Sequence, residues 1–213
     1  MRVRRGLVIV GAVGTVAIAA AVASASPTVR NTESSHGCGH ERWSVKTLMD
    51  SPGKSFDLTK QPVKTTVEEL RRLKVPTTWK QTAPRIGPVE KTLYRVTALL
   101  MSMKREDDDS DIHLVIADPR VGGSMIVEFP ASTCNQDATP AARKLMLDAR
   151  KALTSACGGE PGTNFVTLSG KATLVGVGFF DALHKQGGLA PNGIELHPVI
   201  GVEVVTCKRV QNP

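Results

Sequence analysis

Aromatic residues are scarce in this chain: its 213 residues include five Phe, two Trp and one Tyr. Proteins that bind single-stranded nucleic acid stack the bases on exposed aromatic side chains beside a basic groove. The scarcity of aromatics therefore argues against nucleic acid as a ligand. The chain also lacks a Gly-x-Ser-x-Gly nucleophile elbow, a phosphate-binding loop and a dinucleotide fingerprint. It has no internal repeat, so a repeat architecture is not expected.

A long apolar run occurs at the start of the chain, at residues 6–23. Three arginines precede it and Ala-Ser-Ala follows it, which is typical of a cleaved export signal. The run is rich in Ala, Gly and Val and has no nearby Cys, so we predict a signal peptide at 1–25 rather than a membrane or lipid anchor. Removing it takes away three arginines and lowers the net charge from +7 to +4. We expect a secreted, extracellular protein with no membrane span after cleavage.

Four cysteines, Cys38, Cys134, Cys157 and Cys207, lie in the part that remains. An even number of cysteines in an exported chain favours two disulfides. The sequence His-Gly-Cys-Gly-His around Cys38 could instead bind a metal ion. In an oxidising compartment that thiol is expected to pair with another cysteine, and spacing alone leaves the partner open.

The β-strands and the main helix are predicted in the second half of the chain. Runs of β-forming residues bounded by Gly, Pro and Asp predict five strands at 92–101, 112–117, 124–129, 171–180 and 194–205, with 165–168 leading into the fourth. Between the third and fourth strands, a helix begins after Thr139, has Pro140 in its first turn and carries an apolar stripe to Leu153. This order, β-β-β-α-β-β, is that of an OB-fold. We therefore predict an α+β, mainly β protein with an OB-fold-like five-stranded barrel.

The segments outside the barrel have their own composition. Residues 26–40 are polar and are predicted to be flexible. An arm follows at 41–90, and its short helix is predicted after Thr65 and Thr66 because acidic residues come first and basic residues last. The barrel is placed at 91–207 and a tail at 208–213.

Four polar residues on three predicted strands share one face. Side chains alternate across a strand, so His113, Glu128, Glu195 and His197 point away from the apolar face. The three strands are neighbours in an OB barrel, so these residues form one candidate patch on its outer wall. Two imidazoles and two carboxylates suit a divalent cation or general acid–base catalysis. An outer wall is normally hydrated, however, and polar residues there need no function.

The arm offers a structural alternative for the same residues. Arg42 and Lys46 could pair with Glu128 and Glu195 and hold the arm against the barrel. The patch would then be a clasp rather than a site of chemistry.

In OB-folds the loops between strands 1 and 2 and between strands 4 and 5 carry ligands. The second of these loops supplies Asp181, His184 and Asn192 as candidates. The first contains Glu-Asp-Asp-Asp-Ser-Asp at 106–111, which lacks the Gly and the final Glu of an EF-hand calcium loop. We expect a solvated acidic turn, whose charge also disfavours nucleic acid.

Several segments resemble a family of bacterial exported proteins. They are ERWSVKTLMD at 41–50, RIGPVEKTLYRVTALL at 85–100, IHLVIADP, MIVEFP and GVGFFDALHKQGGLAPNGIELHPV at 176–199. The resemblance implies an OB-like barrel, with a location in or beyond the cell envelope, and no particular activity. It also implies a Cys38–Cys134 disulfide, which leaves Cys157 with Cys207. The chain departs from the family pattern at Lys185, where Gly is expected, and by placing Gly187 ahead of Gly188.

Two main functions are consistent with these observations. The first is an exported binding or interaction module for an extracellular ligand or protein. The second is a metal-assisted hydrolase, phosphodiesterase-like, in which the patch residues hold a divalent cation or act as acid and base. A purely structural accessory domain is the third alternative.

Overall fold

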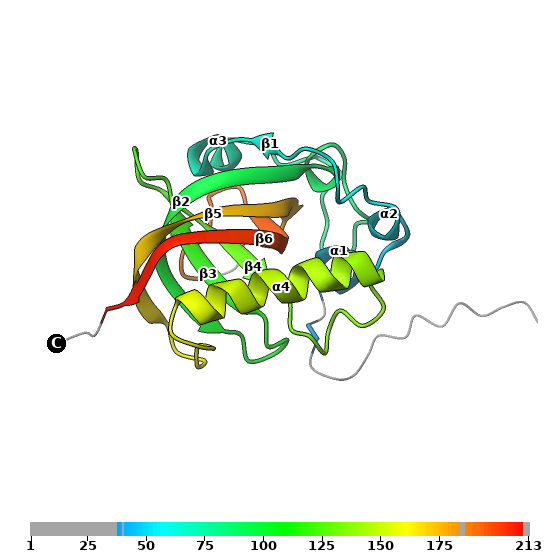
Figure 1. Cartoon of the computed structure of the whole chain (residues 1–213). Helices are drawn as coiled ribbons and strands as arrows, with labels where there is room; N and C mark the ends of the chain where they lie inside the picture. Colours follow the sequence, from blue (N-terminus) through cyan, green and yellow to red (C-terminus); the bar gives the residue numbers. More distant parts are fainter. Residues whose placement is uncertain (1–37, 40, 184–185, 211–213) are drawn as a thin grey trace, which may run out of the picture. The chain divides into compact units, whose positions relative to one another are not determined.

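The computed structural model describes residues 38–39, 41–183 and 186–210. The predicted signal peptide, most of the predicted flexible segment, and His184 and Lys185 lie outside this part. Within it, the protein is mixed α/β and mainly sheet (Figure 1). The strands are β1 (Val63–Lys64), β2 (Leu93–Arg105), β3 (Ile112–Ala117), β4 (Ser124–Phe129), β5 (Val166–Phe180) and β6 (Ile194–Arg209). The helices are α1 (Trp43–Lys46), α2 (Ser51–Lys54), α3 (Val67–Arg71), the 3₁₀ helix η1 (Val89–Lys91) and α4 (Pro140–Ala156).

The strand pairings close on themselves. β2 pairs with β3 and β3 with β4, both antiparallel; β4 pairs with β6 in parallel, and β6 with β5 antiparallel. The ring closes because β5 also pairs with β2 along most of its length. This is the neighbour order predicted from the sequence. β1, which was not predicted, lies beside the first half of β2 and joins the arm to the sheet.

The apolar faces of the strands point into the ring and form the main core. Ile112, Leu114 and Ile116 of β3 are fully buried there, as the alternating pattern predicts. α4 lies along β6 (Figure 1), and Leu153 near its end joins the same core. The start of α4 is fixed by Thr139, whose hydroxyl accepts a hydrogen bond from the backbone N–H of Ala142.

The arm is attached to the ring by short elements. In α3, Thr66 and Glu69 form a capping box in which each side chain accepts a hydrogen bond from the other's backbone N–H. The arm ends at η1, which packs directly against Gly178 of β5. A Cβ atom at Gly178 would lie 2.7 Å from the carbonyl oxygen of Val89 and 2.8 Å from the ring of Tyr94, so only glycine fits.

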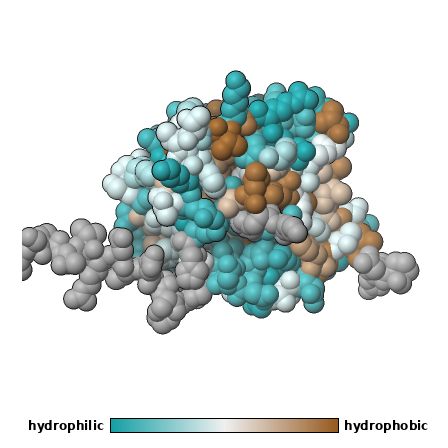
Figure 2. Space-filling view, turned by 180° about the vertical axis from the view of Figure 1, so that it is seen from behind, coloured by the Kyte–Doolittle hydropathy of each residue, from teal (hydrophilic) through white to brown (hydrophobic). Residues whose placement is uncertain are grey.

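Two disulfides join distant parts of the chain. Cys38 is bonded to Cys134 and Cys157 to Cys207, which is the pairing that the family resemblance implied. Disulfides fit a protein of an oxidising compartment. Among the described residues, no helix combines the length and the apolar character needed to cross a membrane. Seen from behind, the surface is mostly hydrophilic and its hydrophobic residues form small, separate groups (Figure 2).

Candidate functional site

The four predicted patch residues come together, but they are buried. His113 and His197 are 0% exposed, Glu195 is 1% exposed and Glu128 4%. The expectation of a hydrated outer wall is therefore wrong. The reason is that other segments cover this face: Phe165 contacts the ring of His113 edge to face, and the backbone of residue 187 reaches the same imidazole.

Glu128 lies between the two imidazoles. In the β3–β4 ladder it is directly opposite His113, and the β4–β6 pairing brings its other side to His197. Its Oε1 lies 3.3 Å from Nδ1 of His113, and its Oε2 lies 2.9 Å from Nδ1 of His197. One carboxylate therefore bridges two histidines, an arrangement that the prediction of a shared face did not include.

The far nitrogen of each imidazole also has a partner. Nε2 of His113 lies 3.0 Å from the carbonyl oxygen of Gly187 and donates to it. Nε2 of His197 lies 3.3 Å from Oδ2 of Asp111. Among the described residues, neither carboxylate oxygen of Glu195 and neither nitrogen of His197 makes a hydrogen bond of good geometry, and Oε2 of Glu195 is 4.0 Å from Nδ1 of His197. The cluster is held together by charge as much as by hydrogen bonds.

The bridging position controls the ionisation of the cluster. Burial alone would lower the pKa of His197, but the negative charge of Glu128 and the contacts with Asp111 and Glu128 outweigh it and raise the pKa to about 10. Burial is likewise outweighed at His113, where contacts with Glu106 and Glu128 raise the pKa to about 10. Burial opposes the charge of Glu128 too, yet the two histidines hold its pKa well below its usual range. With no metal ion bound, both imidazoles are therefore charged at neutral pH.

Burial is outweighed by contacts with His113 and Lys104, which lower the pKa of Glu106, whereas three other acids around this centre shift in the opposite direction. Burial, reinforced by the charges of Glu128 and Asp181, raises the pKa of Glu195 well above its usual range. Burial also raises the pKa of Asp111. Burial and the neighbouring acids Asp111 and Glu128 raise the pKa of Asp109 to about 7. Protons thus neutralise part of the negative charge that the fold brings together.

The clasp alternative required Arg42 to pair with Glu128 or Glu195, but Arg42 pairs with neither. It pairs with Glu90, at the end of the arm, and also donates to the carbonyl oxygen of Phe180. Its guanidinium lies 4.8 Å from the centre of the Phe179 ring. The same ring contacts His197, so Phe179 lies between Arg42 and the cluster. The arm is therefore clasped through Glu90.

Lys46 does approach the cluster. Its Nζ lies 3.5 Å from Oδ2 of Asp181. Burial opposes the charge of Lys46, but Glu128, Asp181, Glu195 and Asp109 together raise its pKa. One ammonium thus faces several carboxylates at the edge of the cluster.

A cavity of about 600 Å³ opens beside Glu128. It lies between the start of the arm, the β2–β3 loop and the residues after β5. Its described lining includes seven acidic residues and one basic residue: Glu41, Glu106, Asp107, Asp108, Asp109, Glu128 and Asp181, with Lys46. A second cavity of about 760 Å³, beside β1, α3 and the β3–β4 turn, has a lining of mixed charge and does not reach the cluster.

The two predicted ligand loops contribute unequally. Asp181 lines the acidic cavity, whereas Asn192 is structural: its amide donates to the carbonyl oxygens of Leu70 and Leu73 and ties the loop to α3. His184 lies outside the described residues. The β2–β3 loop was expected to be a solvated turn, but Asp109 and Asp111 are buried. The carboxylate of Asp109 accepts a hydrogen bond from the backbone N–H of Asp111 within the loop, and that of Asp111 accepts one from the backbone N–H of Ala131 after β4.

Three functional candidates escaped prediction from the sequence. Glu106 lies 3.0 Å from Nδ1 of His113, Asp111 supports His197, and Glu90 anchors the arm. Glu106 and Asp111 were assigned to a solvated loop. Glu106 could have been identified from the alternation of side chains along β2. It follows β2 directly and lies near His113 once the strand is extended to Arg105.

No protein-family model and no curated protein sequence matches the chain. Among solved structures, the chain is similar to one described as a "putative aspartyl-tRNA synthetase" from Leishmania major Friedlin, with 12% sequence identity and a TM-score of 0.40. The match covers 72% of this chain and 22% of that chain. A likeness at this level leaves the function to be argued from the residues of this protein.

Proposed function

We propose that this protein is an exported, OB-fold-like binding module of the bacterial family that its motifs resemble, and that its ligand carries positive charge. Two observations support the fold: the closed order of strand pairings, and the helix between the third and fourth strands of the ring. The acidic cavity lies at the β2–β3 and β5–β6 loops, where OB-folds commonly bind their ligands.

The charge of the cavity carries this proposal. Seven of the described residues that line it are acidic and one is basic. The proton on Asp109 and the two charged histidines offset part of this charge. A concave site lined by one sign of charge attracts the opposite sign and repels its own. A basic segment of a partner protein or an organic amine fits such a cavity, whereas a phosphodiester does not. Nucleic acid is disfavoured for the same reason.

Calorimetry with the mature protein tests this function. A lysine-rich peptide and a polyamine are compared with an acidic peptide of equal length, at low and high salt. Because Asp107 and Asp108 are exposed at the cavity, the double variant Asp107→Asn/Asp108→Asn should bind the cationic probes about thirtyfold more weakly, at roughly 1 kcal/mol for each charge lost. Asp137→Asn/Asp148→Asn is the matched control, since it removes two exposed charges elsewhere. Equal weakening in both, or no binding of any cationic probe, would refute the proposal.

A metal-assisted hydrolase is the second candidate function. The position of Glu128 between two imidazoles, at the edge of a cavity, favours it. The acidic lining favours neutral or cationic esters over phosphodiesters. Activity on an ester panel should fall with chelator and in His113→Ala and His197→Ala, and activity that survives all three would exclude this candidate.

A further inference from the structure

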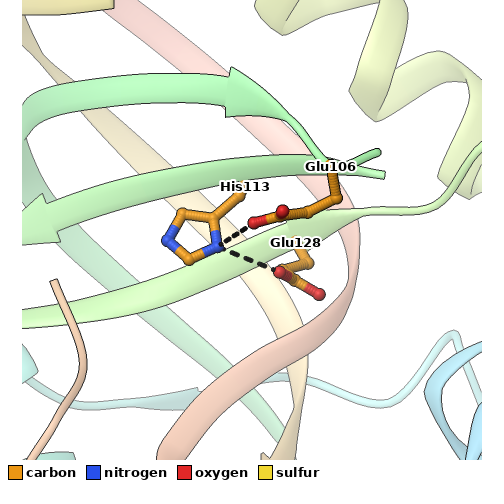
Figure 3. Close-up of side chains that lie close together, drawn as sticks. All are labelled: Glu106, His113 and Glu128. Atoms are coloured by element: carbon orange, nitrogen blue, oxygen red, sulfur yellow. Dashed lines mark ion pairs between the residues drawn. The ribbon is translucent and has the colours of Figure 1, made fainter. Parts of the chain in front are cut away.

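We propose that Glu106, His113 and Glu128 form a binding site for one divalent transition-metal ion, such as Zn²⁺ or Mn²⁺. The site does not depend on the cationic ligand proposed above, and it would supply the ion that a hydrolase needs. Figure 3 shows the three side chains converging from the end of β2 and from β3 and β4. One donor atom from each lies within 4.8 Å of the others.

The distances from Nδ1 of His113 to the two carboxylates fit a shared metal ion better than hydrogen bonds through a proton on Nδ1. This Nδ1 lies 3.0 Å from Oε1 of Glu106 and 3.3 Å from Oε1 of Glu128, yet it makes no hydrogen bond with any residue that the structure describes. Neither oxygen therefore lies along its N–H direction. Two ligands about 2.1 Å from one ion, at an angle of roughly 90–110°, are about 3.0–3.4 Å apart and off each other's axes. The imidazole is 0% exposed, so this unbonded nitrogen is fully buried.

Each of the three side chains is held from behind by a second contact. Nε2 of His113 donates to the carbonyl oxygen of Gly187, 3.0 Å away. Oε2 of Glu106 accepts from Nζ of Lys104 at 2.7 Å, and Oε2 of Glu128 lies 2.9 Å from Nδ1 of His197. Metal-binding histidines commonly donate their other N–H to a carbonyl or carboxylate, and metal-binding carboxylates are hydrogen-bonded in turn. The atoms left to bind an ion are the three that converge: Nδ1 of His113 and the Oε1 atoms of Glu106 and Glu128.

The cavity provides access and open coordination positions. Glu106 and Glu128 both line it, so an ion held between them and His113 faces the cavity. Three protein ligands with open positions are the pattern of catalytic rather than structural metal sites. One imidazole with two carboxylates suits Zn²⁺ or Mn²⁺, whereas Ca²⁺ and Mg²⁺ prefer oxygen ligands alone. Two carboxylates and one divalent ion also balance in charge.

The test uses chelator-treated mature protein and two readouts that do not require activity. Calorimetric titration with Zn²⁺ should give one site per chain, and titration with Co²⁺ should give visible absorption bands. Glu106→Gln removes one ligand, and we expect it to weaken binding at least about 100-fold. Asp108→Asn is the matched control because it removes the same charge from the same cavity without removing a ligand.

Several outcomes would overturn the site. They are the absence of one-to-one binding in the parent protein, equal weakening in Glu106→Gln and Asp108→Asn, and a Co²⁺ spectrum that Glu106→Gln leaves unchanged. Near-UV circular dichroism checks that each variant is folded. Lys104→Met is a second, milder variant: it releases Oε2 of Glu106, and we expect about tenfold weaker binding. Failure of this site leaves the cationic-ligand test intact, because that test rests on Asp107 and Asp108.

Discussion

Replacing Glu90 by Gln should destabilise the protein strongly, because Glu90 neutralises a buried arginine. The side chains of Arg42 and Glu90 are 2% and 0% exposed. The two nitrogens Nη1 and Nη2 of Arg42 lie 2.8 and 2.5 Å from the two oxygens of Glu90. The backbone N–H groups of Ile86 and Phe180 donate to the same carboxylate. Four hydrogen bonds therefore depend on one negative charge.

The magnitude follows from what remains after the substitution. Gln keeps the shape of Glu90 but has no charge, and its NH₂ group faces the donors of Arg42. A guanidinium cannot lose its proton to relieve this, so it stays buried without a counter-charge. Breaking a buried pair in this way costs about 3–5 kcal/mol. The apolar double variant Arg42→Met/Glu90→Leu should cost less than the sum of the two single changes, because it leaves no unpaired charge, although it removes the acceptor of the Ile86 and Phe180 N–H groups.

Equilibrium unfolding in urea, with both disulfides intact, measures these changes. Asp148→Asn in α4 is the control, since it makes the same carboxylate-to-amide change in a pair whose side chains are 76% and 57% exposed. We expect less than about 0.5 kcal/mol there. A loss below about 1 kcal/mol for Glu90→Gln, or a double variant that loses the sum of both single changes, would refute the reasoning.

Three further predictions concern the disulfides and the buried titratable groups. Replacing Cys157 and Cys207 by Ala removes a link across 50 residues and should lower the free energy of unfolding by about 4 kcal/mol in urea titrations; a change under about 1 kcal/mol would contradict this. The folded state raises the pKa of Asp109 from 3.8 to about 7, so ionising it destabilises the fold. Asp109→Asn should therefore be more stable than the parent above pH 7, by at most about 4 kcal/mol, with an advantage that shrinks as the pH falls and vanishes below about pH 4; a difference independent of pH would count against it. The folded state raises the pKa of His197 from 6.5 to about 10, so the stability from its charge is complete below pH 6.5 and is lost as the pH rises through 10. Nitrogen-15 NMR of metal-free protein at pH 8 should show a doubly protonated His197 ring, and a neutral ring would be the contrary result.

The strands were predictable where apolar and polar residues alternate between turn signals. β3 and β4 have the predicted bounds because Asp118-Pro119 and Pro130 end them. β2 and β5 are longer than predicted, since their pairing continues beyond the predicted bounds: Ser102 pairs with Thr167, and Ser169 pairs with Lys208. β1 was missed because it has two residues and both are exposed.

The candidate site was predictable in its members but not in its environment. Alternation along the strands placed His113, Glu128 and His197 on one face, and the neighbour order brought them together. Their burial depends on segments far away in the sequence, among them Phe165 before β5 and the residues after β5. Glu90 could not be recognised because its partner, Arg42, is 48 residues away and no strand pattern connects them.

The parallel pairing of β4 with β6 makes this cluster a late product of folding. It joins residue 126 to residue 195 and is the step that brings His197 to Glu128. Contacts between residues so far apart form slowly, because the chain must lose the entropy of a long loop before they stabilise it. A chain still emerging from a ribosome or a translocation channel has no such cluster until its last strand is free. The histidines and acids therefore meet only once the last strand has joined the sheet.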